Sequence, residues 1–343
     1  MFILGVESSC DETAFSIIER GKENSVIVEE IKSQIDLHKK FGGVVPEIAS
    51  RSHYEVLTEL MNGVMKRSGL NINDIGLISV TNGPGLIGSL LIGLSFAKGL
   101  SYSYKIPIIG VNHILSHAES PFITDLNNIK YPLLSLVVSG GHTTLFHFRT
   151  KFDFEVVSAT RDDATGEVMD KVAKFLGLGY PGGPILDKLY EKGDPERFQF
   201  TIPKMSDGSD DFSFSGYKTA VLRRAASEGI NKKNKDMYDL ISSFLNSVTD
   251  YLILKIRSGL DRFEVKSITV AGGVSKNSLL RKKLRVFSKE KKIPLYLPDS
   301  KYCTDNASMV AWMGYEGFKT FPDNDYGNLY LDAYARKDFN TLI

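Results

Sequence analysis

The sequence predicts an α/β protein that contains one structural unit twice. Residues 2–19 form two apolar, strand-like segments around the polar turn ESSCDET, and residues 133–149 repeat this pattern around SGGHT. A strand that ends in a glycine loop follows in each half, at 78–85 (ISVTNGPG) and at 268–277 (ITVAGGVSKN), and opens a helical segment. Apolar segments split by a short polar turn are typical of β-hairpins. Strands that alternate with helices after a hairpin indicate a duplicated α/β fold.

Helical periodicity predicts the elements between these strands. Apolar residues recur at helical spacing over 46–68 in the first half, and over 165–176, 215–226 and 235–262 in the second. A last helix is expected at about 304–318.

The polar, proline-flanked stretch 124–132 marks the boundary between the halves. We expect a first domain at 1–130 and a second at 131–303. The helix at about 304–320 is expected to pack back on the first domain, with a C-terminal extension at 321–343. A ligand is expected in a cleft between two such halves.

Composition excludes several classes of protein. The 343 residues are 42% hydrophobic, which is enough to form a core in each of two domains. The 42 Lys and Arg residues balance the 41 Asp and Glu residues, so any contact with RNA must be local. Cys10 and Cys303 do not make a disulfide framework. Without a basic leader or a run of about 20 apolar residues, we expect a cytoplasmic protein.

His113 and His117 lie four residues apart in VNHILSHAES, so a helix would place both imidazoles on one face. Such a pair suits two ligands of one metal, with Asp305 in YCTDNAS as the candidate third ligand. Two alternatives stay open: a histidine caps a helix while the other packs in the core, or Asp305 caps the helix that follows it. Cys303 is either a further ligand or a small buried apolar residue.

The histidine pair differs from the H-E-x-x-H motif of zinc peptidases. Ile114 stands where those enzymes have the glutamate that acts as general base, although Glu119 lies nearby. A peptidase built on this pair would lack its usual base.

Four glycine loops could meet phosphate groups through backbone N–H groups. They are 82–85, 138–142, 180–184 and 271–277. None matches the P-loop or the dinucleotide-binding fingerprint, so neither class is indicated, and ordinary tight turns remain the alternative.

The turn ESSCDET places Asp11 and Glu12 beside Glu7 in a hydroxyl-rich loop. Such a turn could position a metal-bound anion or a reacting amine. A solvated hairpin tip is the alternative.

Basic residues gather at 218–235, which includes Lys232 and Lys233, and at 276–292. Both stretches are candidate contacts with a phosphate backbone. A solvated helix face is the alternative reading of each.

Taken in order, nine motifs resemble the bacterial TsaD family, once described as O-sialoglycoprotein endopeptidases. They are GVESSCDET, FGGVVPEIASRSH, NGPGL, VNHILSHAES, VVSGGHT, DDATGEVMDKVAKFLGLGYPGGP, FSFSGYKTAV, AGGVSKN and CTDNASM, and they run from residue 5 to residue 309. The resemblance implies two duplicated actin-like, Hsp70-like ATPase domains (the ASKHA superfold, RNase H-like) with a nucleotide cleft between them. It also implies transfer of threonylcarbamoyl from threonylcarbamoyl-AMP to N6 of adenosine 37 in tRNAs that read codons starting with A, with release of AMP.

The resemblance also assigns roles to residues. Its metal ligands fall on His113, His117 and Asp305, and the metal is Fe(2+), with Zn(2+) as the alternative. The adenylate-binding positions fall on Val137, Val138, Ser139, Gly140, Gly141, His142, Asp170, Gly183, Asp187 and Asn277. From the chemistry of the transfer, and separately from the resemblance, Asp11 is the candidate that receives the amine proton or positions the amine. Lys276, where the family commonly has alanine, adjoins Asn277 and puts adenylate affinity in question.

The family's partners are TsaB, a paralogue that forms a heterodimer with TsaD, and the ATPase TsaE. A third protein, TsaC, makes threonylcarbamoyl-AMP from threonine, bicarbonate and ATP. Three other functions are weighed against this one: a sugar kinase or plain ATPase on the same superfold, a metallopeptidase, and a noncatalytic scaffold. A kinase has no evident use for the histidine pair, and a scaffold has no need of three intact ligands.

Overall fold

The computed structural model describes residues 1–21, 25–230, 235–327 and 329–336. The chain divides into two compact units, which are Met1–Thr124 with Thr304–Ile343, and Asp125–Cys303. The sequence-based boundary was expected between residues 130 and 131. Of the expected C-terminal extension 321–343, residue 328 and residues 337–343 lie outside the described part.

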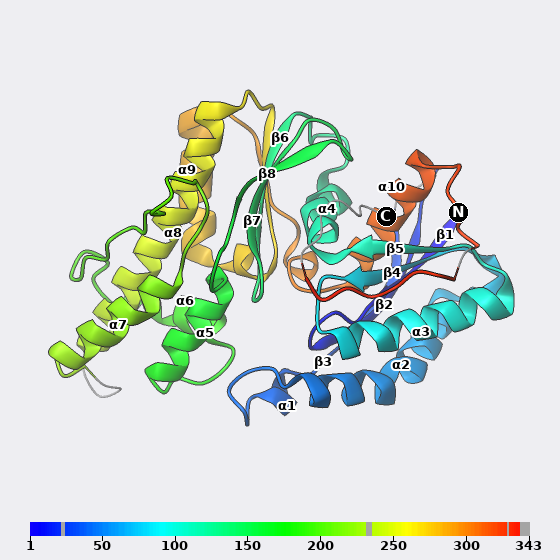
Figure 1. The fold of residues 1–343 in the computed structure, drawn as a ribbon, viewed down its shortest axis with the longest axis horizontal. Coiled ribbons are helices and arrows are strands. Elements are labelled where there is room, and N and C mark those ends of the chain that lie inside the picture. The colour runs from blue at the N-terminus through cyan, green and yellow to red at the C-terminus, as the bar shows by residue number, and fades with distance from the viewer. Residues whose placement is uncertain (22–24, 231–234, 328, 337–343) are drawn as a thin grey trace. The chain divides into compact units, whose positions relative to one another are not determined.

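The first unit contains a five-stranded mixed sheet with the order β3-β2-β1-β4-β5 (Figure 1). Its strands are β1 (Phe2–Glu7), β2 (Glu12–Glu19), β3 (Ser25–Ser33), β4 (Ile75–Gly83) and β5 (Ile108–Asn112). β1, β2 and β3 pair antiparallel, whereas β1, β4 and β5 pair parallel. The expected hairpin is confirmed, with Phe2 opposite Glu19 and Glu7 opposite Ala14.

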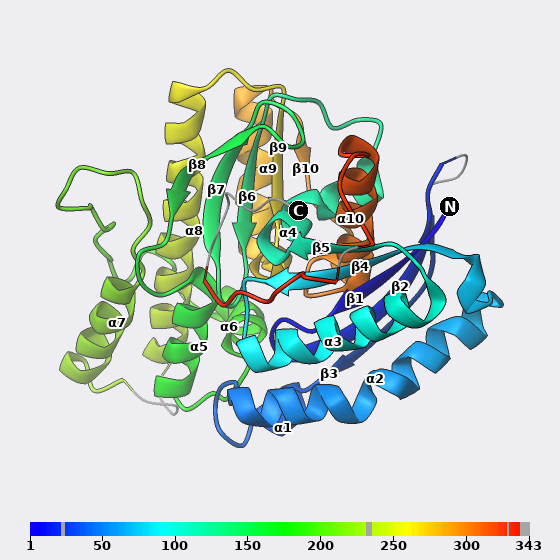
Figure 2. The same ribbon diagram turned by 45° about the vertical axis from the view of Figure 1, so that its right-hand side comes forward.

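Helices cover both faces of this sheet. They are α1 (Ile35–His38), α2 (Pro46–Ser68), α3 (Ile87–Tyr104), α4 (His113–Asp125) and α10 (Ala307–Thr320), with the short 3-10 helix η1 (Ile72–Asp74) before β4. α2 and α3 lie on one face of the sheet and α10 lies on the other (Figure 2). Apolar residues of α2 and α3, such as Leu57, Val64 and Leu94, form a core with the strands.

The close approach of α10 to β1 depends on Gly5. A Cβ at this position would overlap the backbone oxygen of Ala307, the first residue of α10. Because Gly5 has no side chain, the start of α10 lies directly against β1. This contact also fixes the segment just before α10, which carries Asp305.

The second unit repeats the topology of the first, with the strand order β10-β9-β6-β7-β8. Its strands are β6 (Leu133–Val138), β7 (Thr143–Phe148), β8 (Phe154–Ala159), β9 (Ser267–Ala271) and β10 (Leu295–Tyr296). β6, β7 and β8 pair antiparallel, and β6, β9 and β10 pair parallel. The order and directions of the five strands match those of the first unit, so the predicted duplication is confirmed.

In the second unit, α8 and α9 lie along the sheet, and α6, α7 and α9 pack against α8 (Figure 1). The helices of this unit are α5 (Thr165–Phe175), α6 (Gly182–Leu189), α7 (Ser215–Ser227), α8 (Asp236–Arg262) and α9 (Ser278–Lys291), with 3-10 helices η2 (Tyr190–Lys192), η3 (Gly273–Lys276) and η4 (Ser300–Tyr302). Large buried side chains, including Phe212, Phe244 and Tyr251, fill the core between them.

The predicted helices are confirmed: each of 46–68, 165–176, 215–226, 235–262 and 304–318 overlaps one observed helix, with ends that agree within a few residues. Lys232 and Lys233 of the first basic stretch lie outside the described residues. Within the described part of the chain, no helix is long and apolar enough to cross a membrane.

Candidate functional site

The helix that carries both histidines begins at a defined residue. The side-chain oxygen of Asn112, the last residue of β5, accepts hydrogen bonds from the backbone N–H groups of Ile114 at 2.9 Å and Leu115 at 3.1 Å. Asn112 is therefore the N-cap of α4. This cap fixes His113 in the first turn and His117 one turn later. The alternative that a histidine caps this helix is wrong.

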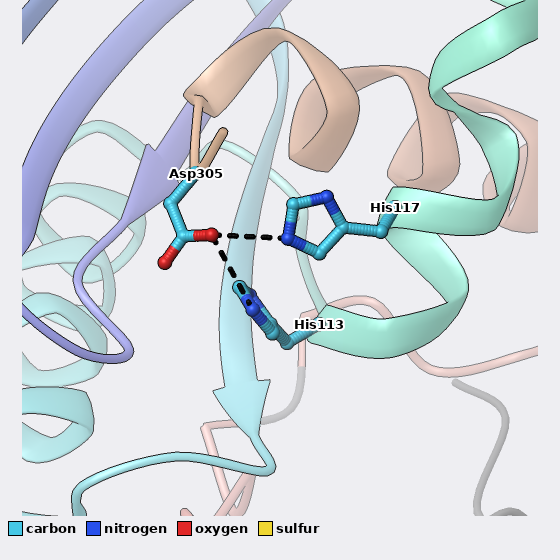
Figure 3. A group of neighbouring side chains, drawn as sticks. All are labelled: His113, His117 and Asp305. Atoms are coloured by element: carbon cyan, nitrogen blue, oxygen red, sulfur yellow. Dashed lines mark hydrogen bonds and ion pairs between the residues drawn. The ribbon is translucent and has the colours of Figure 1, made fainter. Parts of the chain in front are cut away.

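Asp305 does not cap the helix that follows it. The side chain of Asn306 accepts the hydrogen bond from the N–H group of Met309 at 2.9 Å and caps α10. The alternative that Asp305 is the N-cap is therefore wrong, and its carboxylate faces the two histidines (Figure 3). Its Oδ1 atom lies 3.0 Å from Nε2 of His117 and 3.7 Å from Nε2 of His113.

These three side chains fit a metal ion. Each offers one ligand atom, and the three atoms lie within 4.8 Å of one another. Two ligands of a tetrahedral metal with bonds of about 2.0–2.1 Å lie about 3.4 Å apart, and the two distances to Asp305 bracket that value. His113 and His117 are 4% and 1% exposed. Three protein ligands leave coordination positions open, as a catalytic site requires.

The Glu7 carboxylate orients His113. Its Oε2 atom lies 3.3 Å from Nδ1 of His113 and accepts a hydrogen bond from the Thr81 hydroxyl at 2.6 Å, while Oε1 accepts the N–H of Ser9 at 2.6 Å. The Ser9 hydroxyl lies 3.1 Å from the same Nδ1 atom. A carboxylate on one ring nitrogen turns the other toward a metal, which is the usual outer arrangement of histidine ligands.

His113 and Glu7 shift each other's pKa values. Burial lowers the pKa of His113, but the carboxylates of Asp305 and Glu7 outweigh this effect and raise it to about 9. Burial raises the pKa of Glu7, yet the charge and hydrogen bond of His113 hold it below its ordinary value. The metal-free pair is therefore an ion pair at neutral pH, and a cation at Nε2 would replace the proton there.

The second imidazole is held differently. Nδ1 of His117 is buried and forms no hydrogen bond to any other residue that the structure describes. The orientation of His117 therefore rests on its place in α4 and on Asp305.

Two further carboxyl groups, those of Asp11 and Glu12, lie at the turn between β1 and β2. Burial, followed by the charges of Asp305 and Asp11, raises the pKa of Glu12 well above its ordinary value. Burial and the same two carboxylates raise the pKa of the Cys10 thiol well above its usual range. Asp11 is buried, at 8% exposed, and it acts on the Cys10 thiol together with Asp305.

The turn is held in place by α2. Nε2 of His53 lies 3.0 Å from the carbonyl oxygen of Cys10, and Nδ1 lies 2.7 Å from the hydroxyl of Thr13. The carbonyl can only accept, so Nε2 carries the proton and the Thr13 hydroxyl donates to Nδ1. Burial lowers the pKa of His53, which keeps the ring neutral in this arrangement.

The expected adenylate-binding residues all lie in the second unit, and the first group forms the loop between β6 and β7. Ser139 N–H donates to the carbonyl of His142 at 2.8 Å, and His142 N–H donates to the Ser139 hydroxyl at 3.1 Å. Gly140 and Gly141, at the tip, are exposed. A Cβ on either glycine would meet nothing within 4 Å, so the described fold does not require glycine there.

Val137 and Val138 precede this loop as fully buried residues of β6. Their side chains point into the protein. Only their backbone atoms could therefore serve a ligand.

The other expected residues form two pairs. Asp170 accepts the N–H of Gly182 at 2.6 Å, which places its carboxylate at the start of α6 beside Gly183. Asp187 accepts hydrogen bonds from the side-chain amide of Asn277 at 2.8 Å and from the hydroxyl of Ser278 at 2.8 Å. The first pair joins α5 to α6, and the second joins α6 to the start of α9.

Reasoning from sequence missed the residues that support the site. Neither the contact of Glu7 with His113 nor the role of His53 was expected. One signal was present, because Glu7 is an acidic residue at the end of the apolar strand FILGV. Asn112, directly before the histidine pair, was a second signal, since asparagine is a preferred N-cap.

Solved structures with related folds agree with the duplicated α/β architecture. HypF of T. kodakarensis superposes with a TM-score of 0.63 at 13% identity, over 94% of this chain and 48% of that one. Component A of the (R)-2-hydroxyglutaryl-CoA dehydratase of Acidaminococcus fermentans gives 0.54 at 15% identity, over 92% and 98% of the two chains. At such identities the likeness concerns the fold alone.

Sequence comparison is more specific. The family model described as "TsaD: tRNA N6-adenosine threonylcarbamoyltransferase" matches residues 25–312. Proteins with the name tRNA N6-adenosine threonylcarbamoyltransferase are similar over most of their length. That of Thermosipho africanus (strain TCF52B) is 46% identical over 93% of this chain and 95% of its own, and that of Bacillus subtilis (strain 168) is 44% identical over 93% and 91%. The chain belongs to the TsaD family of tRNA N6-adenosine threonylcarbamoyltransferases.

Proposed function

We propose that this chain transfers the threonylcarbamoyl group from threonylcarbamoyl-AMP to N6 of adenosine 37 in tRNAs that read codons starting with A. The observation that carries the proposal is the convergence of His113, His117 and Asp305 in a member of the TsaD family. No comparison favours a sugar kinase, a plain ATPase or a metallopeptidase. Ile114, in the place of a peptidase's general base, argues against the last of these.

The proposed metal is Fe(2+), with Zn(2+) as the alternative. Two imidazole nitrogens and one carboxylate oxygen with open positions are the ligand set of many non-haem Fe(II) sites, and they also suit catalytic zinc. When bound, the cation supplies Lewis acidity and holds the oxygens of the donor. Glu7 keeps Nε2 of His113 directed at the cation.

The backbone of the loop between β6 and β7 is proposed to hold the donor phosphate. The sequence predicted that backbone N–H groups of the loop 138–142 could meet a phosphate, but the N–H of Ser139 already donates to the carbonyl oxygen of His142. The N–H groups of Gly140 and Gly141 form no hydrogen bond to other described residues, so they are the donors left for an anion. The carboxylates of Asp170 and Asp187 are suited to accept hydrogen bonds from ribose hydroxyls.

The reaction is an acyl transfer. N6 of the adenosine attacks the carbamoyl carbon, the bond from that carbon to the phosphate oxygen breaks, and AMP leaves. The amine must lose a proton as the new C–N bond forms, and Asp11 is the proposed acceptor. Its buried position on a turn held by His53 suits that task.

The proposed partners follow from the family and from the balanced charge of the chain. Only one net positive charge on 343 residues gives no broad attraction to tRNA, so helper proteins are expected. We assign TsaB as a heterodimer partner, TsaE as an associated ATPase and TsaC as the source of threonylcarbamoyl-AMP. The proposed place of action is the cytoplasm.

An assay of products separates this function from its rivals. The purified chain is mixed with TsaB, TsaE, unmodified tRNA, and a donor supplied by TsaC, and the tRNA nucleosides are analysed by mass spectrometry. We expect threonylcarbamoyladenosine and AMP in equal amounts. In parallel reactions the chain is given ATP with a sugar, or a glycoprotein. Phosphorylated sugar or cleaved glycoprotein in these, without modified tRNA in the first reaction, would replace the proposal by a kinase or a peptidase.

A further inference from the structure

The segment 276–292, which forms α9 and its two ends, holds an unusual share of the positive charge. It contains eight basic residues and one acidic residue, a net of +7 in 17 residues. Since the whole chain carries +1, the other 326 residues carry a net charge of −6. The positive charge of this protein is therefore strongly localised on one helix.

Some of these charges are used within the fold. Arg281 donates to the backbone oxygens of Ser275 at 2.7 Å and Pro298 at 3.2 Å. Lys283 forms an ion pair with Asp250 at 2.6 Å. Both side chains join α9 to its own unit.

The acidic residue of the segment does not neutralise its neighbours. Glu290 lies 3.7 Å from Arg257 of α8. Within the described part of the chain, no cation of α9 forms an ion pair with Glu290.

Three of these cations form a stripe along α9, which we call the α9 stripe: Lys282, Arg285 and Lys289. Their spacing of three and four residues puts them on one face of the helix, over about 10 Å of rise. All three are exposed, and none of their side chains forms a hydrogen bond or ion pair with another residue that the structure describes. Val286, on the same face, is 62% exposed.

The position of the stripe decides which polyanion it suits. The helix begins with Ser278, whose hydroxyl and N–H bind Asp187 together with the Asn277 amide. The stripe therefore starts one turn from residues assigned above to the adenylate. A nucleic acid that brings a nucleobase to the donor would contact the α9 stripe with its backbone. A membrane surface would gain nothing from a stripe that starts beside the adenylate residues.

We propose that the α9 stripe binds the sugar-phosphate backbone of the tRNA substrate. The inference rests on the proposed function and adds the surface that holds the acceptor. Lysine and arginine neutralise phosphates by releasing counterions, so the contribution of the stripe depends on salt. Lys276, exposed at the start of the segment, extends the same positive surface toward Asn277.

The test is the salt dependence of tRNA binding by the full chain together with TsaB and TsaE, measured by fluorescence anisotropy. Each lost phosphate contact lowers the slope of log K against log salt by about 0.7–0.9. The variant K282Q/R285Q/K289Q is expected to lower the slope by about 2–3 and to weaken binding about 100-fold at 0.15 M salt. Its metal content and melting temperature should match those of the wild type.

The matched control neutralises three exposed lysines of the first unit, as K32Q/K66Q/K319Q. It removes the same charge and should bind tRNA within about threefold of the wild type, as expected when only distant, screened charges change. Equal loss in both variants would show a general effect of net charge and overturn the proposal. Unchanged tRNA binding by the stripe variant, or a loss confined to binding of phosphatidylserine vesicles, would also overturn it.

The same proteins separate this inference from the proposed function. If the wild type forms threonylcarbamoyladenosine while the stripe variant matches it in tRNA affinity and KM, the inference fails and the function stands. If the wild type binds tRNA through the stripe but forms no modified nucleoside, the function fails and the surface stands.

Discussion

Glu7 and His113, 106 residues apart, meet where Oε2 of the carboxylate lies 3.3 Å from Nδ1 of the imidazole. This contact turns Nε2 of the same ring toward Asp305, 3.7 Å away. The parallel pairing of β1, β4 and β5 brings the ends of β1 and β5 to the same edge of the sheet, where Glu7 and the start of α4 lie. The fold therefore positions one side of the candidate metal site through the buried carboxylate of Glu7.

Loss of Glu7 is expected to weaken metal binding without removing a ligand. Glu7→Gln keeps the shape of the side chain but removes the charge that holds the Nδ1 proton of His113. Outer partners of this kind are worth about 10- to 100-fold in metal affinity. Competition with a chelator measures the affinity. Ser9→Ala, which removes the uncharged neighbour of the same nitrogen, is the control and should cost less; an equal effect of both changes would contradict the assigned role.

His113→Ala is expected to remove metal and activity together. It deletes one of three ligands, and two remaining protein ligands hold a cation much more weakly. Metal analysis should find far less than one ion per chain, while far-UV circular dichroism stays that of the wild type. His147→Gln, a buried histidine of the second unit, serves as a control that should retain metal. Full activity in metal-free His113→Ala protein would end the proposal.

Metal affinity is expected to rise with pH. The carboxylates around His113 raise its pKa to about 9 in the metal-free protein, so the ring carries a proton at neutral pH that the metal must displace. Observed affinity should increase up to about tenfold per pH unit toward pH 9 and level off above it. Titration with Co²⁺, which reports its coordination by absorption, measures this. In Glu7→Gln the levelling should occur at lower pH, and an affinity independent of pH between 7 and 9 would contradict the assignment.

Two adjacent glycines of α6 should respond to alanine in opposite ways. A Cβ at Gly182 would lie 2.6 Å from the backbone oxygen of Met169 and 2.7 Å from Cα of Asp170, so Gly182→Ala should destabilise the fold by about 1–3 kcal/mol. A Cβ at Gly183 would meet only Met169 Sδ, at 3.8 Å. Gly183→Ala should therefore leave the melting temperature unchanged or slightly higher. It should nevertheless weaken the binding of AMP, measured by calorimetry; unaltered AMP binding would remove Gly183 from the nucleotide site.

Asp11→Asn is expected to slow the transfer step. An amide cannot receive the amine proton, and removal of a general base typically costs about 10²–10⁴ in rate. Metal content and AMP affinity should remain those of the wild type, which separates a role in proton transfer from a role in folding. If Asp11→Asn has the same single-turnover rate as the wild type, Asp11 is not the general base.

The sequence predicted the fold well because its signals are local. In the sequence, each hairpin has two apolar segments around a polar turn, and each helix has apolar residues at helical spacing. The hairpins β1–β2 and β6–β7 and the helices α2 and α8 therefore appear where they were predicted. The spacing of His113 and His117 also placed both on one helix. These features depend on residues that are near one another in the chain.

Contacts between distant segments could not be predicted in this way. Asp305 reaches the histidines because Gly5 lets α10 lie against β1, and no spacing in the sequence reports that approach. The separate capping role of Asn306 could be seen only in the structure, since Thr304, Asp305 and Asn306 are all residues that cap helices. Likewise, the use of the Ser139 N–H by His142 depends on the shape of the loop.

Iron titration measures whether the transfer depends on a metal held by His113, His117 and Asp305. The chain is stripped of metal, loaded anaerobically with increasing Fe(2+), and assayed with TsaB, TsaE, donor and tRNA for threonylcarbamoyladenosine. We predict that product formation rises in proportion to bound iron and saturates at one ion per chain. His113→Ala should form no product at any iron concentration. A metal-free chain that modifies tRNA as fast as the loaded chain would contradict this prediction.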